Sequence, residues 1–245
     1  MINIQKPSPV SHEGKFLEVH SIFRTIQGEG PFSGRSAIFI RLSGCNLQCP
    51  FCDTDYTNGS VVKSVKEIRS ELFEIFGVTP IEETELYPEQ PLLNRLIVIT
   101  GGEPFRQNIS ALIYMLLQEG AVIQIETNGT LRGKDIPFHS PNLHIVCSPK
   151  TKTIDAGIKM NVKAFKYVIN HNSIDWENGL PALALGNQNS ARHVAMPTRG
   201  IPVYVQPADM QNETENKLNL EACIELVHRF GYTLCLQTHK IINLP

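Results

Sequence analysis

The chain has no hydrophobic run that could cross a membrane, because its longest apolar stretches fall far short of the roughly 20 residues a transmembrane helix needs. Its first residues, Met1–Ile4, are not the positively charged start of a signal peptide, so we expect a cytoplasmic protein. Charge of one sign is also lacking: the formal net charge is −2, and lysine and arginine form no block. We therefore predict that the protein contacts neither a membrane nor nucleic acid and acts on a small molecule.

Cysteine is sparse, with six residues in 245, which is too few for a secreted fold held together by disulfides. Three of the six nevertheless lie close together, at Cys45, Cys49 and Cys52, in the spacing C-x3-C-x2-C. The others lie far away in apolar runs, and we expect Cys147 and Cys235 to be buried members of the core.

Three thiolates on one short loop can hold a four-iron cluster. Cysteine ligation normally takes one thiolate per iron, so three cysteines leave one iron open to a small chelating molecule, such as S-adenosylmethionine (SAM) with its amino and carboxylate groups. Structural zinc is the alternative, although zinc prefers four ligands and no second Cys-x2-Cys or His-x3-His pair supplies the fourth. The spacing favours an iron–sulfur cluster and leaves the zinc site open.

Apolar residues make up 42% of the chain, enough for the core of a single domain over residues 1–245. Apolar runs and alternation predict strands at residues 16–25, 36–42, 96–99, 121–125, 143–147, 165–169, 201–205 and 232–236. Helical spacing predicts helices at residues 65–76, 108–118 and 218–230. We expect residues 1–15 to form a loose N-terminal arm, and residues 78–93 and 170–200 to be loop or insertion segments.

Most of the predicted strands end in a polar or glycine-rich cluster. These clusters are residues 100–104, 126–129, 148–150, 206–209 and 237–240. In parallel α/β folds the loops that follow the strands build the active site, so we expect these clusters to share one face with the cysteine loop. The strand order, with few clear helices between strands, predicts an α/β fold of the partial (β/α) barrel type.

Two polar patterns flank the cysteine loop. Arg41 is a cation near the end of an otherwise apolar strand; such a charge is usually solvated, but it could also bind an anion at the mouth of a cavity. Asp53, Thr54 and Asp55 follow the last cysteine and could hold a hard cation such as magnesium, although a solvated turn is the simpler interpretation of the bare pattern.

The chain resembles a known superfamily and, within it, one family. Its cysteine loop is similar to the C-x3-C-x-aromatic-C loop of radical SAM enzymes, with Phe51 in the aromatic position. The chain as a whole resembles the 7-carboxy-7-deazaguanine synthases of queuosine and deazapurine biosynthesis. The matching motifs occur in the family's order at residues 26–30 (IQGEG), 41–47 (RLSGCNL), 52–54 (CDT), 100–104 (TGGEP), 126–130 (ETNGT), 148–150 (SPK) and 237–240 (QTHK).

This resemblance implies an enzyme, a carbon–nitrogen lyase. Members of the family contract the ring of 6-carboxy-5,6,7,8-tetrahydropterin to 7-carboxy-7-deazaguanine with loss of ammonia. They use a 4Fe-4S cluster, SAM as a regenerated radical initiator, and Mg2+. The resemblance further implies a modified partial barrel, a homodimer, and an external electron donor of the flavodoxin type.

The same resemblance implies roles for individual residues. Cys45, Cys49 and Cys52 would ligate the cluster, and Thr54 would be the protein ligand of Mg2+. SAM would lie against Phe51, Asp53, Gly102, Ser148, Pro149, Lys150, Gln206, Pro207, Ala208 and Asp209. The pterin would contact Ile26, Gln27, Gly28, Glu29, Arg41, Thr100, His239 and Pro245.

The terminal carboxylate carries a sharper expectation. It belongs to Pro245, six residues beyond His239, and six residues reach at most about 20 Å, so the tail can fold back over the cavity. There the carboxylate would accept hydrogen bonds from the amino-pyrimidine edge of the pterin. Glu29 and His239 are candidates for proton transfer only through their expected proximity to the substrate.

Two other functions stay open at this point. One is a radical SAM activase that makes a glycyl radical on a partner protein. The other is a zinc-binding scaffold without catalytic activity, which would be colourless and free of iron.

Overall fold

The protein is represented by a computed structural model that describes residues 5–50, 52, 54–77, 91–185 and 193–245. Its centre is a nine-stranded sheet in the order β11-β10-β7-β6-β5-β4-β2-β1-β3. Neighbouring strands from β2 (Ser36–Leu42) to β11 (Thr233–Leu234) run parallel. At the other end β1 (Phe16–Ile26) pairs antiparallel with β2 and with β3 (Val61–Ser64).

The parallel strands follow one another in sequence order, which is the winding of a barrel rather than of a doubly wound sheet. The remaining strands of the sheet are β4 (Leu96–Gly101), β5 (Val122–Thr127), β6 (Leu143–Cys147), β7 (Val162–Ile169) and β10 (Val203–Pro207). Because β3 and β11 are its edges, the sheet is open, and the predicted fold, a partial α/β barrel, is confirmed.

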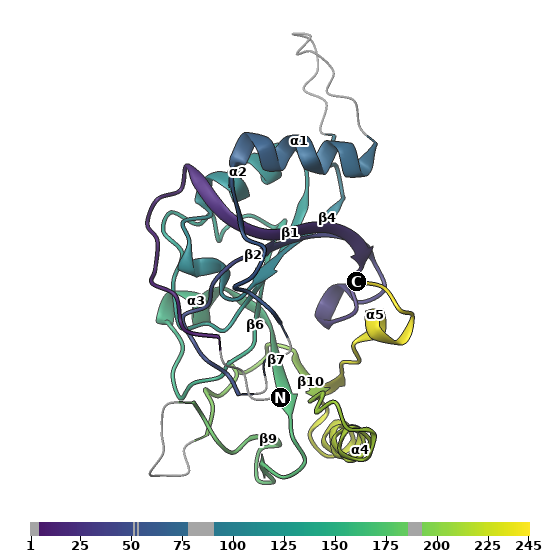
Figure 1. Ribbon diagram of the computed structural model, residues 1–245. Coiled ribbons are helices and arrows are strands. Elements are labelled where there is room, and N and C mark those ends of the chain that lie inside the picture. The colour runs from purple at the N-terminus through teal and green to yellow at the C-terminus, as the bar shows by residue number, and fades with distance from the viewer. Residues whose placement is uncertain (1–4, 51, 53, 78–90, 186–192) are drawn as a thin grey trace.

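Helices and turns complete the fold. They are α1 (Val65–Phe76), α2 (Ser110–Gln118), α3 (Ala156–Asn161), α4 (Glu213–Phe230), α5 (Thr238–Ile241), the 3-10 turns η1 (Gly30–Phe32) and η2 (Pro104–Arg106), and the hairpin β8 (Ile174–Asp175) and β9 (Leu180–Pro181). Figure 1 shows α1, α2 and α3 outside the curve of the sheet, whereas α5 and the C-terminus lie on its open side, near the end of β1. In the described part of the chain no helix combines the length and the apolar composition needed to span a membrane.

The two faces of the sheet differ because successive side chains of a strand point to opposite sides. One face belongs to the main core; it includes Ile38 and Ile40 of β2, which lie in one cluster with Leu72 of α1 and Leu112 of α2. The alternate positions of the same strands, such as Phe39 and Arg41, face the inside of the curve. The inner face is therefore free to carry polar groups at the carboxyl ends of the strands.

All eight predicted strands occur, with ends shifted by up to three residues, but some predicted boundaries and segments were wrong. Helix α4 begins at Glu213 rather than at residue 218, because the Asn212 side chain accepts a hydrogen bond from the backbone N–H of Glu215 and caps an exposed first turn. Neither α3 nor β3 was predicted, and residues 237–240, expected as a loop, contain the start of α5.

The segments without predicted regular structure have different outcomes. Residues 5–14 form no helix or strand but are not loose: Ser8 N–H donates to the Cys45 carbonyl at 2.7 Å, and Gln5 bonds to both Thr54 and Tyr56. The arm therefore lies along the cysteine loop. Residues 170–200 contain the β8–β9 hairpin; residues 1–4, 78–90 and 186–192 lie outside the described residues.

Candidate functional site

Two adjoining cavities lie at the carboxyl ends of the parallel strands. The first, here called the central cavity, has a volume of about 330 Å³ and is lined by all three cysteines of the loop. The second, the side cavity, has about 930 Å³ and a more apolar lining that includes Leu183 and Val194. Both cavities are lined by Cys52 and Thr54, so they meet at the cysteine loop.

The central cavity collects most of the predicted site residues. Its lining includes Ile26, Gln27, Glu29, Arg41, Cys45, Cys49, Cys52, Thr54, Thr100, Gly102, Ser148, Lys150, Gln206, Pro207, Ala208, Asp209, His239 and Pro245. Pro149 lines the side cavity. Gly28 lies behind His239, since a Cβ on Gly28 would stand 2.3 Å from the His239 Nδ1 atom. Phe51 and Asp53 lie outside the described residues.

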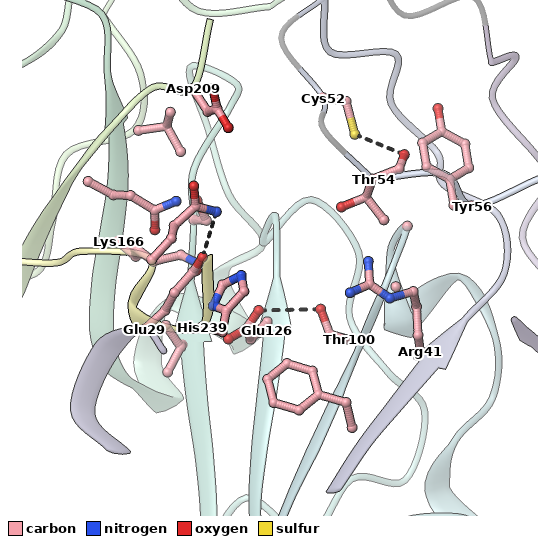
Figure 2. A pocket seen from close by; sticks show the side chains of 18 of the residues that line it. Glu29, Arg41, Cys52, Thr54, Tyr56, Thr100, Glu126, Lys166, Asp209 and His239 are labelled. Carbon is pink, nitrogen blue, oxygen red and sulfur yellow. Dashed lines mark hydrogen bonds and ion pairs between the residues drawn. The ribbon is translucent and has the colours of Figure 1, made fainter. Parts of the chain in front are cut away.

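Figure 2 shows the arrangement inside the central cavity. Cys52, Thr54 and Arg41 stand on one side, Asp209, Lys166 and Glu29 on the opposite side, and Glu126 and His239 lie between them. Residues from all five predicted strand-end clusters line the cavity together with the cysteines. The expected convergence of these clusters is therefore present in the structure.

Buried polar side chains hold the root of the cysteine loop. The Arg106 guanidinium donates to the Ser43 carbonyl at 2.9 Å and forms an ion pair with Glu18. Gln107 donates to the same Ser43 carbonyl at 3.3 Å. Because Arg106 and Gln107 are almost fully buried, these bonds fix the direction in which the chain enters the loop.

Two glycines at the end of β4 support the loop from below. A Cβ on Gly102 would stand 2.1 Å from the Gly44 carbonyl oxygen, and one on Gly101 would stand 2.0 Å from that of Leu42. The Gly102 N–H donates to Leu42 O at 3.2 Å. The N–H of Gly102 is thus used inside the protein and does not face a ligand. The absence of a side chain lets two backbone segments meet.

The tip of the loop is tied to the cluster that follows β5. Asn46 donates to the Thr130 hydroxyl at 2.8 Å and accepts from the Asn128 side chain at 3.0 Å. The fully buried Glu103 accepts hydrogen bonds from Thr127 and from the backbone of Asn128, both at 2.7 Å. Burial raises the pKa of Glu103 to about 7 despite these donors. Motifs far apart in sequence therefore form one network under the loop.

The cysteines suit a polynuclear cluster. All six cysteines of the chain are free, so the disulfide alternative is wrong. Burial raises the pKa of Cys45 to about 12 and that of Cys49 to about 11, so these thiols need a nearby positive charge such as a metal to ionise. Within the described ranges no three histidine, cysteine or carboxylate side chains converge on a single metal position. Three thiols spread around one cavity fit a cluster in which each binds a different iron.

Glu126 is a hub that the motif analysis did not single out. Its carboxylate accepts hydrogen bonds from Gln124 at 2.9 Å, from Gln27 at 3.2 Å and from the Thr100 hydroxyl at 3.3 Å. It lies on the inner face of β5 and lines the central cavity. Its motif had been recognised, but its carboxylate had been given no role.

Lys166 is the second residue that the sequence reasoning missed. It forms an ion pair with Glu29, whose other carboxylate oxygen accepts a hydrogen bond from Gln237 at 3.0 Å. Burial alone would raise the pKa of Glu29 and lower that of Lys166, but their mutual attraction reverses both shifts. A lysine inside the apolar run of β7 was the available signal, of the same kind as Arg41 in β2.

Asp209 and the C-terminus border the cavity at its open side. Asp209 accepts a hydrogen bond from Lys240 of α5 at 2.9 Å, which with further donors lowers the pKa of Asp209 to about 2. The carbonyl oxygen of the terminal residue, Pro245, accepts a hydrogen bond from the Thr25 hydroxyl at 2.8 Å. The tail thus folds back to the end of β1, where it lines the central cavity.

An open α/β barrel whose strands end around a C-x3-C-x2-C loop defines a radical SAM enzyme. A solved structure described as QueE from Escherichia coli shares the fold, with a TM-score of 0.61 over 90% of this chain and 93% of that chain, at 22% sequence identity.

Comparison with known sequences gives the family. No family model matches the chain. The chain is 39% identical over 241 residues to the 7-carboxy-7-deazaguanine synthase of Rhodospirillum rubrum, covering 96% of each protein. It is 36% identical over 244 residues to that of Rickettsia prowazekii, covering 98% of this chain and 93% of the relative. The chain therefore belongs to the 7-carboxy-7-deazaguanine synthase family. The predicted family is confirmed, and the activase and zinc-scaffold alternatives are set aside.

Proposed function

We propose that the central cavity binds the substrate of the family's reaction and that the side cavity receives SAM. The chain is a radical SAM enzyme that contracts 6-carboxy-5,6,7,8-tetrahydropterin to 7-carboxy-7-deazaguanine, with release of ammonia, in queuosine biosynthesis. The observation that carries the assignment of the cavity is that the three cysteines, Arg41 and the C-terminus line the same volume of about 330 Å³. Small-molecule sites begin at about this size.

The cysteine loop is proposed to hold the cluster where the two cavities meet. Cys45, Cys49 and Cys52 would supply three ligands, which would leave one iron without a cysteine and available to SAM. When bound and reduced, the cluster supplies the electron that cleaves SAM to the radical that abstracts a hydrogen atom. The protein's own contribution is to keep this loop rigid through its buried bonds to Arg106 and Asn128.

Two residues define how the protein can border SAM. The backbone of Ala208 is fully engaged, because its N–H donates to the Ile169 carbonyl at 2.9 Å and its carbonyl accepts from Asn219 at 2.8 Å. We therefore assign its methyl group to the contact. Lys150 is held by its bond to the Ser148 carbonyl at 3.0 Å and faces Cys49, where its charge favours the thiolate.

Complementary charges support the proposed orientation of the pterin. Arg41 is the cation on one side of the cavity and pairs with the substrate carboxylate. The carboxylates of Glu126 and Pro245 accept hydrogen bonds from the amino-pyrimidine edge. Thr100 and His239 border the ring between these groups.

Thr54 is proposed as the protein ligand of Mg2+. It lines both cavities, next to Cys52, where substrate and water can complete the shell. The neighbouring Asp55 does not join it: its carboxylate accepts from Thr57 and Asn58 in an exposed turn, which lowers its pKa to about 2. The solvated-turn interpretation therefore applies to Asp55.

Glu29 has a structural part in this scheme rather than the part of a proton carrier. Its carboxylate stays ionised because it pairs with Lys166 and accepts from Gln237. His239 remains the candidate near the substrate. The homodimer, the flavodoxin-type electron donor, the cytoplasmic location and the absence of a nucleic-acid contact stay predictions.

The experiment that tests the function is anaerobic reconstitution with iron and sulfide, followed by assay with SAM, reductant, Mg2+ and 6-carboxytetrahydropterin. We expect the ultraviolet absorbance of the deazaguanine product to appear without net consumption of SAM. A brown protein that cleaves SAM yet leaves the pterin unchanged would refute the substrate assignment while preserving the radical chemistry.

A further inference from the structure

The C-terminal carboxylate meets a single buried hydroxyl at the end of β1. Thr25 is 5% exposed, lies on the inner face of its strand, and donates its hydroxyl hydrogen to Pro245 O at 2.8 Å. Both residues line the central cavity. Thr25 belongs to none of the motifs that define the family resemblance; it is two positions before Gln27.

The root of the tail is firmly attached to the segment that follows Thr25. The Thr238 N–H donates to the Gly28 carbonyl at 3.3 Å, and Gln237 donates to Glu29 at 3.0 Å. Since a Cβ on Gly28 would stand only 2.3 Å from His239, the start of α5 lies directly against this backbone. The first residues of the C-terminal segment therefore have fixed positions.

The last residues are held far less firmly. Ile241 is 66% exposed and Leu244 is 38% exposed, so the tail buries little apolar surface. Asn243 has a φ of 55°, a left-handed turn that directs the chain back towards β1. Two backbone bonds fix the turn, from the Asn243 N–H to the Lys240 carbonyl at 3.3 Å and from the Leu244 N–H to the His239 carbonyl at 2.9 Å. Beyond it, the bond from Thr25 fixes the carboxylate itself.

We propose that Thr25 is a positioning residue that holds the terminal carboxylate of Pro245 in the central cavity, so that this carboxylate can receive the substrate. The proposal rests on the proposed function, because it takes the pterin as the molecule that the carboxylate meets. The second carboxylate oxygen and the remaining lone pairs are then available for the donors of the amino-pyrimidine edge. Hydrogen bonds to a charged group are the stronger kind, so one hydroxyl suffices to orient it.

The test is a cycle of four proteins, each reconstituted anaerobically. They are the natural chain, Thr25→Val, the natural chain extended by two glycines after Pro245, and the extended chain with Thr25→Val. Valine keeps the β-branched shape that suits a strand and removes only the hydroxyl. The extension moves the carboxylate away and leaves the tail otherwise unchanged.

We expect Thr25→Val to raise the KM for the pterin about tenfold or more, as loss of a hydrogen bond to a charged group does. The extension should raise KM at least as much. In the extended chain Thr25→Val should have no further effect, because the hydroxyl then has no carboxylate to hold. Thr25→Ser keeps the hydroxyl and should restore a KM near that of the natural chain, while SAM cleavage without pterin should be equal in all five proteins.

Three results would overturn the proposal. They are an unchanged KM in Thr25→Val, penalties that simply add in the doubly changed protein, and an extension without effect on KM. Should Thr25→Val bind less iron than the natural chain, Thr25→Ala enters the same cycle and is judged by the same criterion. A natural chain that cleaves SAM but never converts the pterin refutes the proposed function instead, and the two failures are thereby distinguished.

Discussion

The buried ion pair between Glu29 and Lys166 should be the most sensitive contact of the central cavity. Their side chains are 12% and 10% exposed, and they come from segments far apart in the sequence, after β1 and within β7. The perturbation is Lys166→Met, which keeps the length of the side chain and removes its charge. Glu29 would then stay buried with the Gln237 side chain as a donor, a far weaker partner than an ammonium group.

The expected loss follows from the burial of the pair. Removing one partner of a buried ion pair costs about 3–5 kcal/mol of folding free energy, because the other charge stays uncompensated. In a chain of 245 residues a change of about 1 kcal/mol shifts Tm by about 2–4 °C, so we expect Tm to fall by about 6–20 °C. The assay is thermal unfolding of the reconstituted protein, followed by circular dichroism in the absence of oxygen.

Lys163→Met is the matched control, because Lys163 lies on the same strand but is exposed. Its change should stay within about 0.5 kcal/mol. Glu29→Gln combined with Lys166→Met removes both charges and should recover much of the lost stability, since neutral replacement of a buried pair is often harmless. The reasoning fails if Lys166→Met and Lys163→Met have the same Tm. It also fails if the double variant is no more stable than Lys166→Met alone.

The pH dependence of this difference has a defined sign. The pKa of Glu29 is lowered from 4.5, so its contribution to stability is present above that value and is lost as pH falls through the lowered pKa. The pKa of Lys166 is raised from 10.5, so its contribution is present below that value and is lost as pH rises through the raised pKa. Between about pH 6 and 9 the contribution of the pair to the stability of the natural chain should therefore be constant.

Three further changes test the cysteine loop. Cys45→Ala should abolish the visible absorbance of the reconstituted cluster and lower bound iron, whereas Cys223→Ala, a buried cysteine elsewhere, should leave both unchanged. Thr54→Ala should remove the stimulation of turnover by Mg2+ with SAM binding intact, and Thr54→Ser should keep it; Mg2+ dependence that survives in the alanine variant would make Thr54 structural. Asn46→Ala should hasten the loss of iron to a chelator several-fold, because about two hydrogen bonds that hold the loop tip are lost; an unchanged rate would show that the root of the loop suffices.

The position of the site could be predicted because the polar clusters are local to the strand ends. Thr100 is the last residue but one of β4, Glu126 is the last but one of β5, and Ser148 follows β6; each apolar run before them is visible in the sequence. Once the strands are taken as parallel and sequential, their carboxyl ends must meet at one edge of the sheet. No knowledge of side-chain contacts is needed for that step.

The contacts inside the site could not be predicted, because they depend on how distant segments fit together. Glu29 and Lys166 are separated by 137 positions, and nothing in the sequence around either residue indicates that the other is its partner. The Gly101–Gly102 pair shows the same limit: glycine indicates a close approach, but only the structure shows that the neighbour is the backbone of Leu42 and Gly44. The exposed start of α4 could not be predicted for a different reason: a helix turn that faces water has no apolar periodicity.

The register of the sheet explains why charged residues inside apolar strands mark the site. Arg41 pairs with Thr100 across β2 and β4, and Glu126 pairs with Val146 across β5 and β6. The pair before Glu126, Ile99 with Ile125, places Thr100 and Glu126 at the same level.

These side chains therefore form one row across the inner face, at the carboxyl ends of the strands just before the loops. The helices α1, α2 and α3 lie on the other side of the sheet, so a charge in the row meets the cavity rather than the core. Deeper positions on the same face, such as Phe39 and Val98, are apolar, because they lie below the open end. Lys166 fits the same rule: it stands two residues beyond Ala164, where the β6–β7 register resumes after its irregularity. In a parallel sheet that is covered on one side, a charged residue within the last four positions of an apolar strand thus indicates a ligand-facing row.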